Sequence, residues 1–179
     1  VKKMENFLKL IFAFGVGFVL VLIAMPRVIP FLHKMKFGQV EREEGLESHK
    51  KKGGTPTMGG VVFVLAAVIA AFVVNYKNIT NPNLILITIV LVGYSLIGFI
   101  DDALIILKHQ NEGLKAWQKF LMQAILAVGC YLYLENFVPG FTTEVTIPIV
   151  KVNIDFGWFY AILVFIMFTG ESNGVNLSD

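Results

Sequence analysis

The chain has 179 residues, of which 56% are hydrophobic and 16% are charged, and its mean hydropathy is +0.71. Soluble domains carry about 25% charged residues, so this composition excludes an ordinary soluble protein and indicates an integral membrane protein. A net charge of +2 is too small to indicate nucleic acid as a partner, and a single cysteine, Cys130 in an apolar run, excludes a disulfide framework or a zinc set.

Five apolar segments follow one another and are predicted to be transmembrane helices. The first three are long enough for a helix to cross a hydrocarbon layer of about 30 Å. The last two have only 15 uncharged residues each, so they span only if flanking residues such as Lys119 reach back to the head groups. The chain is therefore expected to be a single all-α polytopic domain over residues 1–179. The predicted spans are residues 7–25, 58–76, 82–100, 117–135 and 156–171.

The distribution of Lys and Arg predicts the orientation. Ten of these residues lie in residues 26–57 and 101–119, against five at the N-terminus and in the other connections. Because cytoplasmic connections carry the positive excess, residues 26–57, 101–116 and 172–179 are expected to be cytoplasmic loops and the N-terminus external.

Residues 140–155 differ from the rest of the chain. Val145, Ile147 and Ile149 alternate with Thr146 and Pro148, and the same period of two continues from Val150 to Ile154. This pattern predicts a short external β-hairpin, in which proline restricts the first strand to an edge or a turn.

Two adjacent carboxylates, Asp101 and Asp102, follow the third span directly, where membrane meets water. Such a pair favours a metal ion or a cationic partner and lies within reach of lipid head groups, although a solvated helix end is the simpler interpretation. Two further polar segments are predicted on the same cytoplasmic side. One is the lysine- and glycine-rich stretch 50–60, suited to an anion at a helix N-terminus; the other is the amide-rich stretch 170–179, suited to a nucleotide, a sugar or a metal.

These segments together resemble a known family. Four segments are similar to the bacterial phospho-N-acetylmuramoyl-pentapeptide transferases. They are the Gly-Thr-Pro-Thr-Met-Gly-Gly core within residues 52–60, the Gly-Phe-Ile-Asp-Asp of residues 98–102, residues 172–179 and the stretch 36–45. That family belongs to the polyprenyl-phosphate N-acetylhexosamine-1-phosphate transferases. The resemblance implies transfer of phospho-N-acetylmuramoyl-pentapeptide from UDP to undecaprenyl phosphate, forming lipid I and UMP, with Mg²⁺ as cofactor, in the bacterial cytoplasmic membrane.

The resemblance also implies roles for individual residues. Asp101 would deprotonate or orient the undecaprenyl phosphate and Asp102 would support the metal, although the reverse assignment stays open because adjacent carboxylates titrate together. Asp102 and Asp179 are the expected metal ligands, with the main ligand expected in a further half of the protein. A homodimer is left open. The expected substrate-binding residues are Lys52, Thr57, Lys119, Asn173, Asn176 and Asp179.

The chain also departs from the family pattern. Family members are about twice as long, with ten spans, so the chain is interpreted as an N-terminal half. Glu171 stands where a small residue is usual, and Ser178 where threonine is common. Two alternatives are a sister transferase for N-acetylglucosamine-1-phosphate and half of a membrane transporter; the latter would place ionisable residues in mid-span, and the second to fifth predicted spans show none there.

Overall fold

The computed structural model describes residues 2–35, 58–108 and 113–178. Its residues group into two compact units, one formed by Val1–Ile79 with Gly98–Lys115 and the other by Thr80–Ile97 with Ala116–Asp179. Each unit is described by itself. The elements in chain order are the helices α1 (Lys2–Met35), α3 (Gly60–Val74), α4 (Pro82–Lys108) and α5 (Ala116–Phe137), the strands β1 (Glu144–Ile147) and β2 (Val152–Asp155), and the helix α6 (Tyr160–Ser178).

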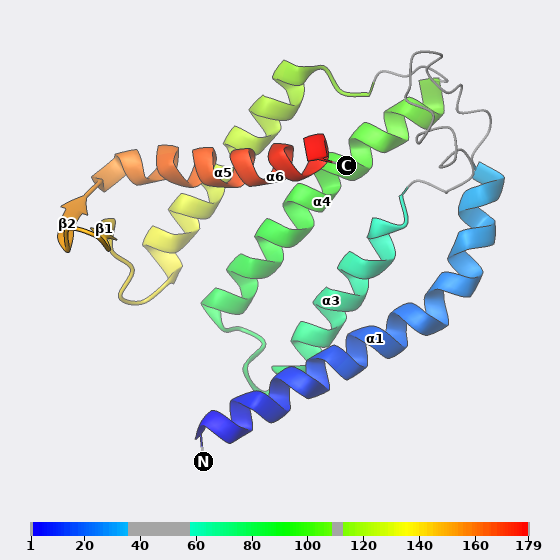
Figure 1. Cartoon of the computed structure of the whole chain (residues 1–179), viewed down its shortest axis with the longest axis horizontal. Helices are drawn as coiled ribbons and strands as arrows, with labels where there is room; N and C mark the ends of the chain where they lie inside the picture. The colour runs from blue at the N-terminus through cyan, green and yellow to red at the C-terminus, as the bar shows by residue number, and fades with distance from the viewer. Residues whose placement is uncertain (1, 36–57, 109–112, 179) are drawn as a thin grey trace. The chain divides into compact units, whose positions relative to one another are not determined.

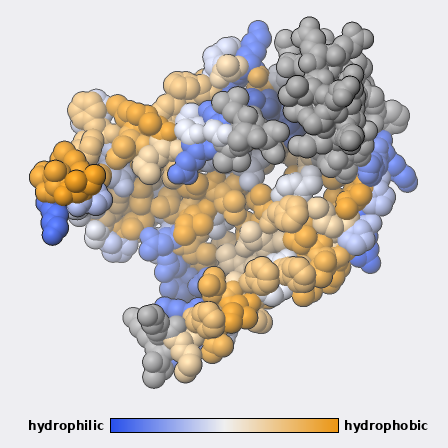
Figure 2. Space-filling view, in the orientation of Figure 1, coloured by the Kyte–Doolittle hydropathy of each residue, from blue (hydrophilic) through white to orange (hydrophobic). Residues whose placement is uncertain are grey.

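Within the described residues, three helices are long and apolar enough to cross a membrane. They are Met4–Lys34, Pro82–Lys108 and Ala116–Phe137, and the shorter helix α3 is also apolar. Hydrophobic atoms cover much of the described surface in Figure 2, as expected for helices whose side chains face lipid instead of water. The chain is therefore a membrane protein; the count of five spans and their orientation stay predictions.

In the first unit, α1 packs against α3. The buried residues of α3, Val62, Ala66 and Ala70, recur every four residues and so share one face. A Cβ added at Gly17 of α1 would lie 3.8 Å from the Cβ of Ala70, so small side chains allow the two backbones to approach closely.

Helix α1 continues well beyond the predicted end of the first span at residue 25. It contains Pro26 and Pro30, each of which removes a helical hydrogen bond, and the helix curves along this half in Figure 1. The guanidinium of Arg27 donates to the carbonyl of Ile23, one turn before it, at 3.0 Å.

Helix α4 begins as predicted. Asn81 accepts hydrogen bonds through Oδ1 from the backbone N–H groups of Asn83 at 2.9 Å and Leu84 at 3.3 Å, and Pro82 occupies the first helical position, where no N–H donor is needed. Residue 101, where the predicted cytoplasmic loop begins, is not the end of the helix, because α4 continues to Lys108. No glycine or proline interrupts residues 101–108, so the helix has no reason to end at the carboxylates.

In the second unit, α5 packs against α6. The rings of Tyr131, Phe141 and Tyr160 form a cluster with centroids 5.3 to 6.4 Å apart, which joins α5, the connection after it and the first turn of α6. Helix α6 continues to Ser178, through most of the predicted cytoplasmic loop 172–179. Gly170 and Gly174 lower helix propensity without ending the helix.

The predicted hairpin is present as a two-stranded antiparallel sheet of β1 and β2. Its turn closes with a hydrogen bond from the N–H of Lys151 to the carbonyl of Ile147 at 2.8 Å, and Lys151 adopts a left-handed backbone conformation with φ of 51°. The prediction of an external position is not tested by the fold.

Candidate functional site

The first unit contains the predicted carboxylate pair. Asp101 and Asp102 lie on α4, about two turns before its end at Lys108, and both side chains are half-buried. Oδ1 of Asp101 accepts a hydrogen bond from the backbone N–H of Leu114 at 2.7 Å. Because a carboxylate is charged, this bond is stronger than one between neutral groups, and it fixes one oxygen of Asp101 against the segment that precedes α5.

Gly113 makes this contact possible. A Cβ added there would lie 2.3 Å from Oδ1 of Asp101 and 2.8 Å from its backbone oxygen, closer than side-chain carbons approach other atoms. The residue must therefore be glycine for the backbone to rest on Asp101 in this way. We call Gly113 and Leu114 the clamp segment.

The two carboxylates do not share one direction. Adjacent residues on a helix are about 100° apart around its axis, so Asp101 and Asp102 project from different faces of α4. With Asp101 turned toward the clamp segment, Asp102 faces a different neighbourhood. The arrangement allows two distinct roles for two chemically identical groups.

The second unit contains two further predicted residues. Lys119 lies in the first turn of α5 and is half-buried, and Asn173 is exposed on α6. Oδ1 of Asn173 accepts from Nε2 of Gln123 at 3.5 Å, which is a long and weak hydrogen bond. Lys119 on α5 and Asn173 on α6 therefore belong to a different unit from the carboxylate pair.

The remaining predicted residues are not placed by the structure. Lys52, Thr57 and Asp179 lie outside the described residues, and Asn176 lies on α6 with its side chain undescribed. Their assigned roles stay predictions.

A magnesium site is compatible with the groups that are described. The described residues contain no cluster of three or more His, Cys, Asp or Glu side chains. A Mg²⁺ ion that also binds substrate phosphates and water needs only one or two protein carboxylates, however. The donor set of Asp101 and Asp102 therefore fits a shared phosphate–metal site.

Sequence reasoning missed several polar residues of these units. Gln123 is only 3% exposed, and within the described structure its Oε1 has no hydrogen-bond partner. A pocket of about 460 Å³ on the second unit is lined by Glu171, Ser172 and Ser95 together with mostly apolar residues of α4 and α6. A polar residue in an apolar run marks Gln123 in the sequence, whereas no signal marks Leu114, since every non-proline residue has a backbone N–H.

Comparison with known proteins identifies the family. A model described as glycosyl transferase family 4 matches residues 84–179, which cover α4 except its first two residues, α5, the hairpin and α6. The chain belongs to glycosyl transferase family 4. A second model, described as phospho-N-acetylmuramoyl-pentapeptide-transferase signature 1, matches residues 52–64, where the lysine- and glycine-rich stretch runs into α3.

Comparison with individual relatives shows which enzymes the chain is similar to. The chain is 45% identical to the phospho-N-acetylmuramoyl-pentapeptide-transferase of Halalkalibacterium halodurans over 91% of its own length and 50% of that protein. The corresponding values are 41%, 95% and 52% for the enzyme of Bacillus subtilis, and 43%, 95% and 51% for that of Clostridium novyi. The chain thus spans about half the length of the curated relatives it matches, and it resembles this branch of the glycosyl transferase family, as the motifs predicted.

Proposed function

We propose that the chain forms one half of a phospho-N-acetylmuramoyl-pentapeptide transferase of a bacterial cytoplasmic membrane. The donor would be UDP-N-acetylmuramoyl-pentapeptide, the acceptor undecaprenyl phosphate, and the products lipid I and UMP. The observation that carries the proposal is the carboxylate pair on α4, with Asp101 held by the clamp segment at 2.7 Å. The identity of 41% to 45% to relatives with that name supports the choice of substrate class.

The proposed reaction is a phosphoryl transfer, in which the enzyme chiefly neutralises charge and aligns the attacking oxygen. An oxygen of undecaprenyl phosphate attacks the β-phosphorus of the UDP-sugar, the bond from that phosphorus to the bridging oxygen breaks, and UMP leaves. Asp101 orients the acceptor phosphate and accepts its proton where one is present. Lys119 lies near the phosphates and Asn173 binds the uridine side, together with Lys52, Thr57, Asn176 and Asp179.

The proposal includes a magnesium ion held by Asp102 and Asp179, with a further ligand from the other half of the protein. When bound, the ion would offset negative charge on the phosphates. The fixed backbone of α4 supplies Asp102 in one orientation, because a helix holds its side chains more rigidly than a loop does.

The proposed orientation has the carboxylate pair in the cytoplasm and the hairpin outside. It can be tested with the single-cysteine variants Gly45→Cys and Thr142→Cys in a background lacking Cys130. A membrane-impermeant maleimide added to intact cells should label Thr142→Cys and leave Gly45→Cys unlabelled until the cells are opened. The reverse pattern would overturn the orientation.

The function itself is tested by a transfer assay with the whole protein in membranes. Radiolabelled UDP-N-acetylmuramoyl-pentapeptide and UDP-N-acetylglucosamine are offered separately with undecaprenyl phosphate and Mg²⁺. We expect label to enter the lipid phase only from the first donor, with release of UMP and loss of transfer after chelation of the metal. Transfer from UDP-N-acetylglucosamine alone would favour the sister transferase, and no transfer from folded protein would overturn both.

A further inference from the structure

The hairpin divides its side chains sharply by polarity. In the observed register, Val145 pairs with Ile154 and Ile147 with Val152, whereas Glu144 pairs with Asp155 and Thr146 with Asn153. Directly paired residues of an antiparallel sheet point to the same side, and neighbours along a strand point to opposite sides. One face of the hairpin is therefore entirely aliphatic, and the other carries two carboxylates, a hydroxyl and an amide. The aliphatic face comprises Val145, Ile147, Val152 and Ile154.

The polar face is held together by its own hydrogen bonds. The hydroxyl of Thr146 donates to Oδ1 of Asn153 across the strands at 2.8 Å. At the base of the hairpin, Oδ1 of Asp155 accepts from the hydroxyl of Thr143 and from the backbone N–H of Gly157, the latter at 3.0 Å. These bonds fix which side of the ribbon is polar, and they leave the aliphatic side as the one available for a partner.

The aliphatic face is largely open, with only Val145 half-buried. At the tip, Ile149 is 94% exposed and Val150 60% exposed, and Ile147, Val152 and Ile154 are also exposed. Figure 2 shows hydrophobic atoms gathered at the hairpin, with hydrophilic atoms beside them. An isolated two-stranded hairpin is marginally stable in water and gains stability when its apolar face is covered. Such a face indicates an interaction surface.

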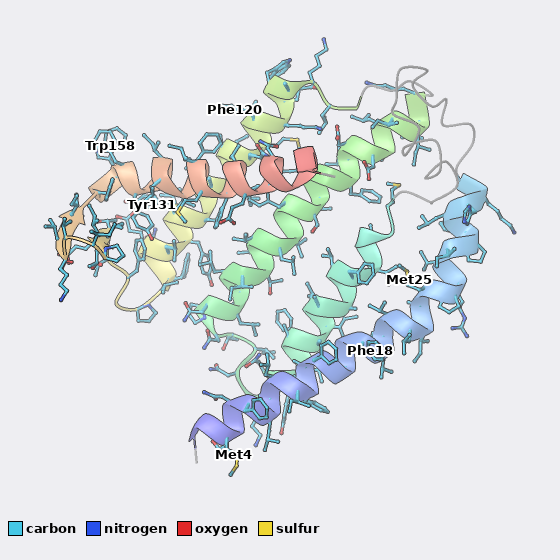
Figure 3. All side chains as sticks on the ribbon, viewed as in Figure 1. Met4, Phe18, Met25, Phe120, Tyr131 and Trp158 are labelled. Carbon is cyan, nitrogen blue, oxygen red and sulfur yellow. The ribbon has the colours of Figure 1, made fainter. Side chains whose placement is uncertain are left out.

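The connections of the hairpin place it at a membrane surface. Helix α5 has 22 residues, about 33 Å of helix, which matches the hydrocarbon thickness. It ends at Phe137, so only residues 138–143 separate its end from β1. The chain on the other side of the hairpin carries Trp158 and Phe159, whose rings stack at 3.8 Å and are exposed; Trp158 is labelled between β2 and α6 in Figure 3. Aromatic residues at the ends of spans mark the head-group level.

The distribution of charge on the hairpin also favours a membrane surface as the partner. The face with Glu144 and Asp155 is repelled by lipid phosphates, whereas the aliphatic face carries no charge. Lys151, next to the apolar tip, has a long side chain that can extend an ammonium group to a phosphate while its methylenes stay in an apolar environment. An apolar face with a lysine at its end suits a phospholipid surface.

We propose that the hairpin of β1 and β2 is an interfacial membrane anchor, whose aliphatic face and tip lie in the boundary between head groups and acyl chains of the leaflet at which α5 ends. The partner is phospholipid, recognised by apolar area and by the lysine. A role of this kind fixes the start of α6 relative to the membrane surface. It does not depend on which side of the membrane the hairpin occupies, nor on the reaction proposed above.

The anchor can be tested with environment-sensitive labels at two positions. In the whole protein without other cysteines, Ile149→Cys at the tip and Glu144→Cys on the polar face each receive an NBD fluorophore. Glu144 is a matched control, because it is exposed on the same hairpin and its replacement removes a like charge opposite Asp155. The proteins are placed in nanodiscs of phosphatidylethanolamine and phosphatidylglycerol, with or without lipids that carry a nitroxide near the acyl carbonyl.

Nitroxide lipids should quench the label at position 149 at least about threefold more than the label at position 144, and aqueous iodide should show the opposite order, since an interfacial segment lies about 5–10 Å below the head groups. If both labels are equally open to iodide and insensitive to the nitroxide, the tip lies in water and the proposal fails. If position 149 is shielded from both quenchers, protein covers it, either a second copy or the rest of the molecule, and the proposal also fails.

Discussion

Asp101 and Asp155 each accept a hydrogen bond from a backbone N–H, and their settings are opposite. Asp101 bonds to Leu114, thirteen residues away, is half-buried, and has Gly113 pressed against it without room for a Cβ. Asp155 bonds to Gly157, two residues away, and is exposed. The bond between Asp155 and Gly157 stabilises only the turn in which both residues lie. The distant bond fixes the position of a carboxylate relative to another segment, which is what a reactive group requires.

The largest effect is expected from removing the charge of Asp101. Asn at this position still offers an oxygen to the N–H of Leu114, so Asp101→Asn keeps the contact and loses the negative charge. We expect turnover of the whole protein to fall by about two or more orders of magnitude, with little change in binding of the UDP-substrate. Steady-state transfer kinetics measure both quantities.

The matched control for this change is Asp155→Asn, which removes a carboxylate with the same kind of backbone bond. It should leave turnover within about twofold, as expected for a surface substitution. If the two variants lose activity equally, the distinction between the two aspartates does not hold. If Asp101→Asn retains normal turnover, its assignment to the reaction is wrong.

A smaller loss of turnover is expected when Asp101 is displaced but keeps its charge. Gly113→Ala forces the clamp segment away from the carboxylate, because the added Cβ would lie 2.3 Å from Oδ1. Since a misplacement of about 1 Å can cost about a hundredfold in rate, we expect turnover to fall at least about tenfold, with the KM for the UDP-substrate nearly unchanged.

Gly15→Ala on α1 is the control for this variant, because an added Cβ there meets no atom within 4 Å. It should keep normal turnover and normal amounts of protein in the membrane. A Gly113→Ala enzyme with unchanged turnover would show that the clamp segment does not position Asp101 during the reaction.

Lys52→Ala tests a predicted substrate-binding residue outside the described part of the chain. The lysine-rich stretch is predicted to meet the soluble substrate in the cytoplasm, where an exposed cation attracts a nucleotide weakly and is screened by salt. We expect a KM for the UDP-substrate raised about two- to fivefold at low salt, with the difference shrinking as salt is added. An unchanged KM at low salt would leave Lys52 only its role in orienting the chain.

The smallest effect concerns Asp155 and pH. The hydroxyl of Thr143 and the N–H of Gly157 lower the pKa of this carboxyl below its ordinary value. A lowered pKa in the folded state stabilises the hairpin above the ordinary carboxyl pKa of about 4, and this stabilisation is lost as the pH falls through the lowered value. Anisotropy of an NBD label at position 149 should therefore stay constant from pH 7 to about 5 and decrease below about 4. Asp155→Asn should remove this pH dependence.

The sequence predicted the elements better than their ends. Hydropathy marked the apolar core of α1, α4 and α5, and alternation marked the hairpin, because these signals come from the surroundings each side chain enters. Two predicted boundaries, at residues 101 and 172, fall inside the helices α4 and α6. Charged side chains do not end a helix without a proline or a glycine cap, so α4 carries Asp101 and Asp102 past the predicted boundary.

The site was only partly predictable for a different reason. Asp101, Asp102 and Asn173 carry functional groups whose type suggests their chemistry. The bond from Leu114 uses a group that all non-proline residues share, and the need for glycine at position 113 arises only when the segment meets α4. Such features depend on tertiary contact, which no local pattern encodes.

The uninterrupted course of α4 from Pro82 to Lys108 has a consequence for how this protein tolerates changes in length. Inserting or deleting one residue between Pro82 and Asp101 would turn both carboxylates by about 100° around the helix axis and shift them by about 1.5 Å. Relatives should therefore vary by substitution in this stretch. The turn at residues 148–151 has no such constraint, because extra residues at an exposed tip leave the register of β1 and β2 intact. Insertions and deletions in natural variants should gather at that turn.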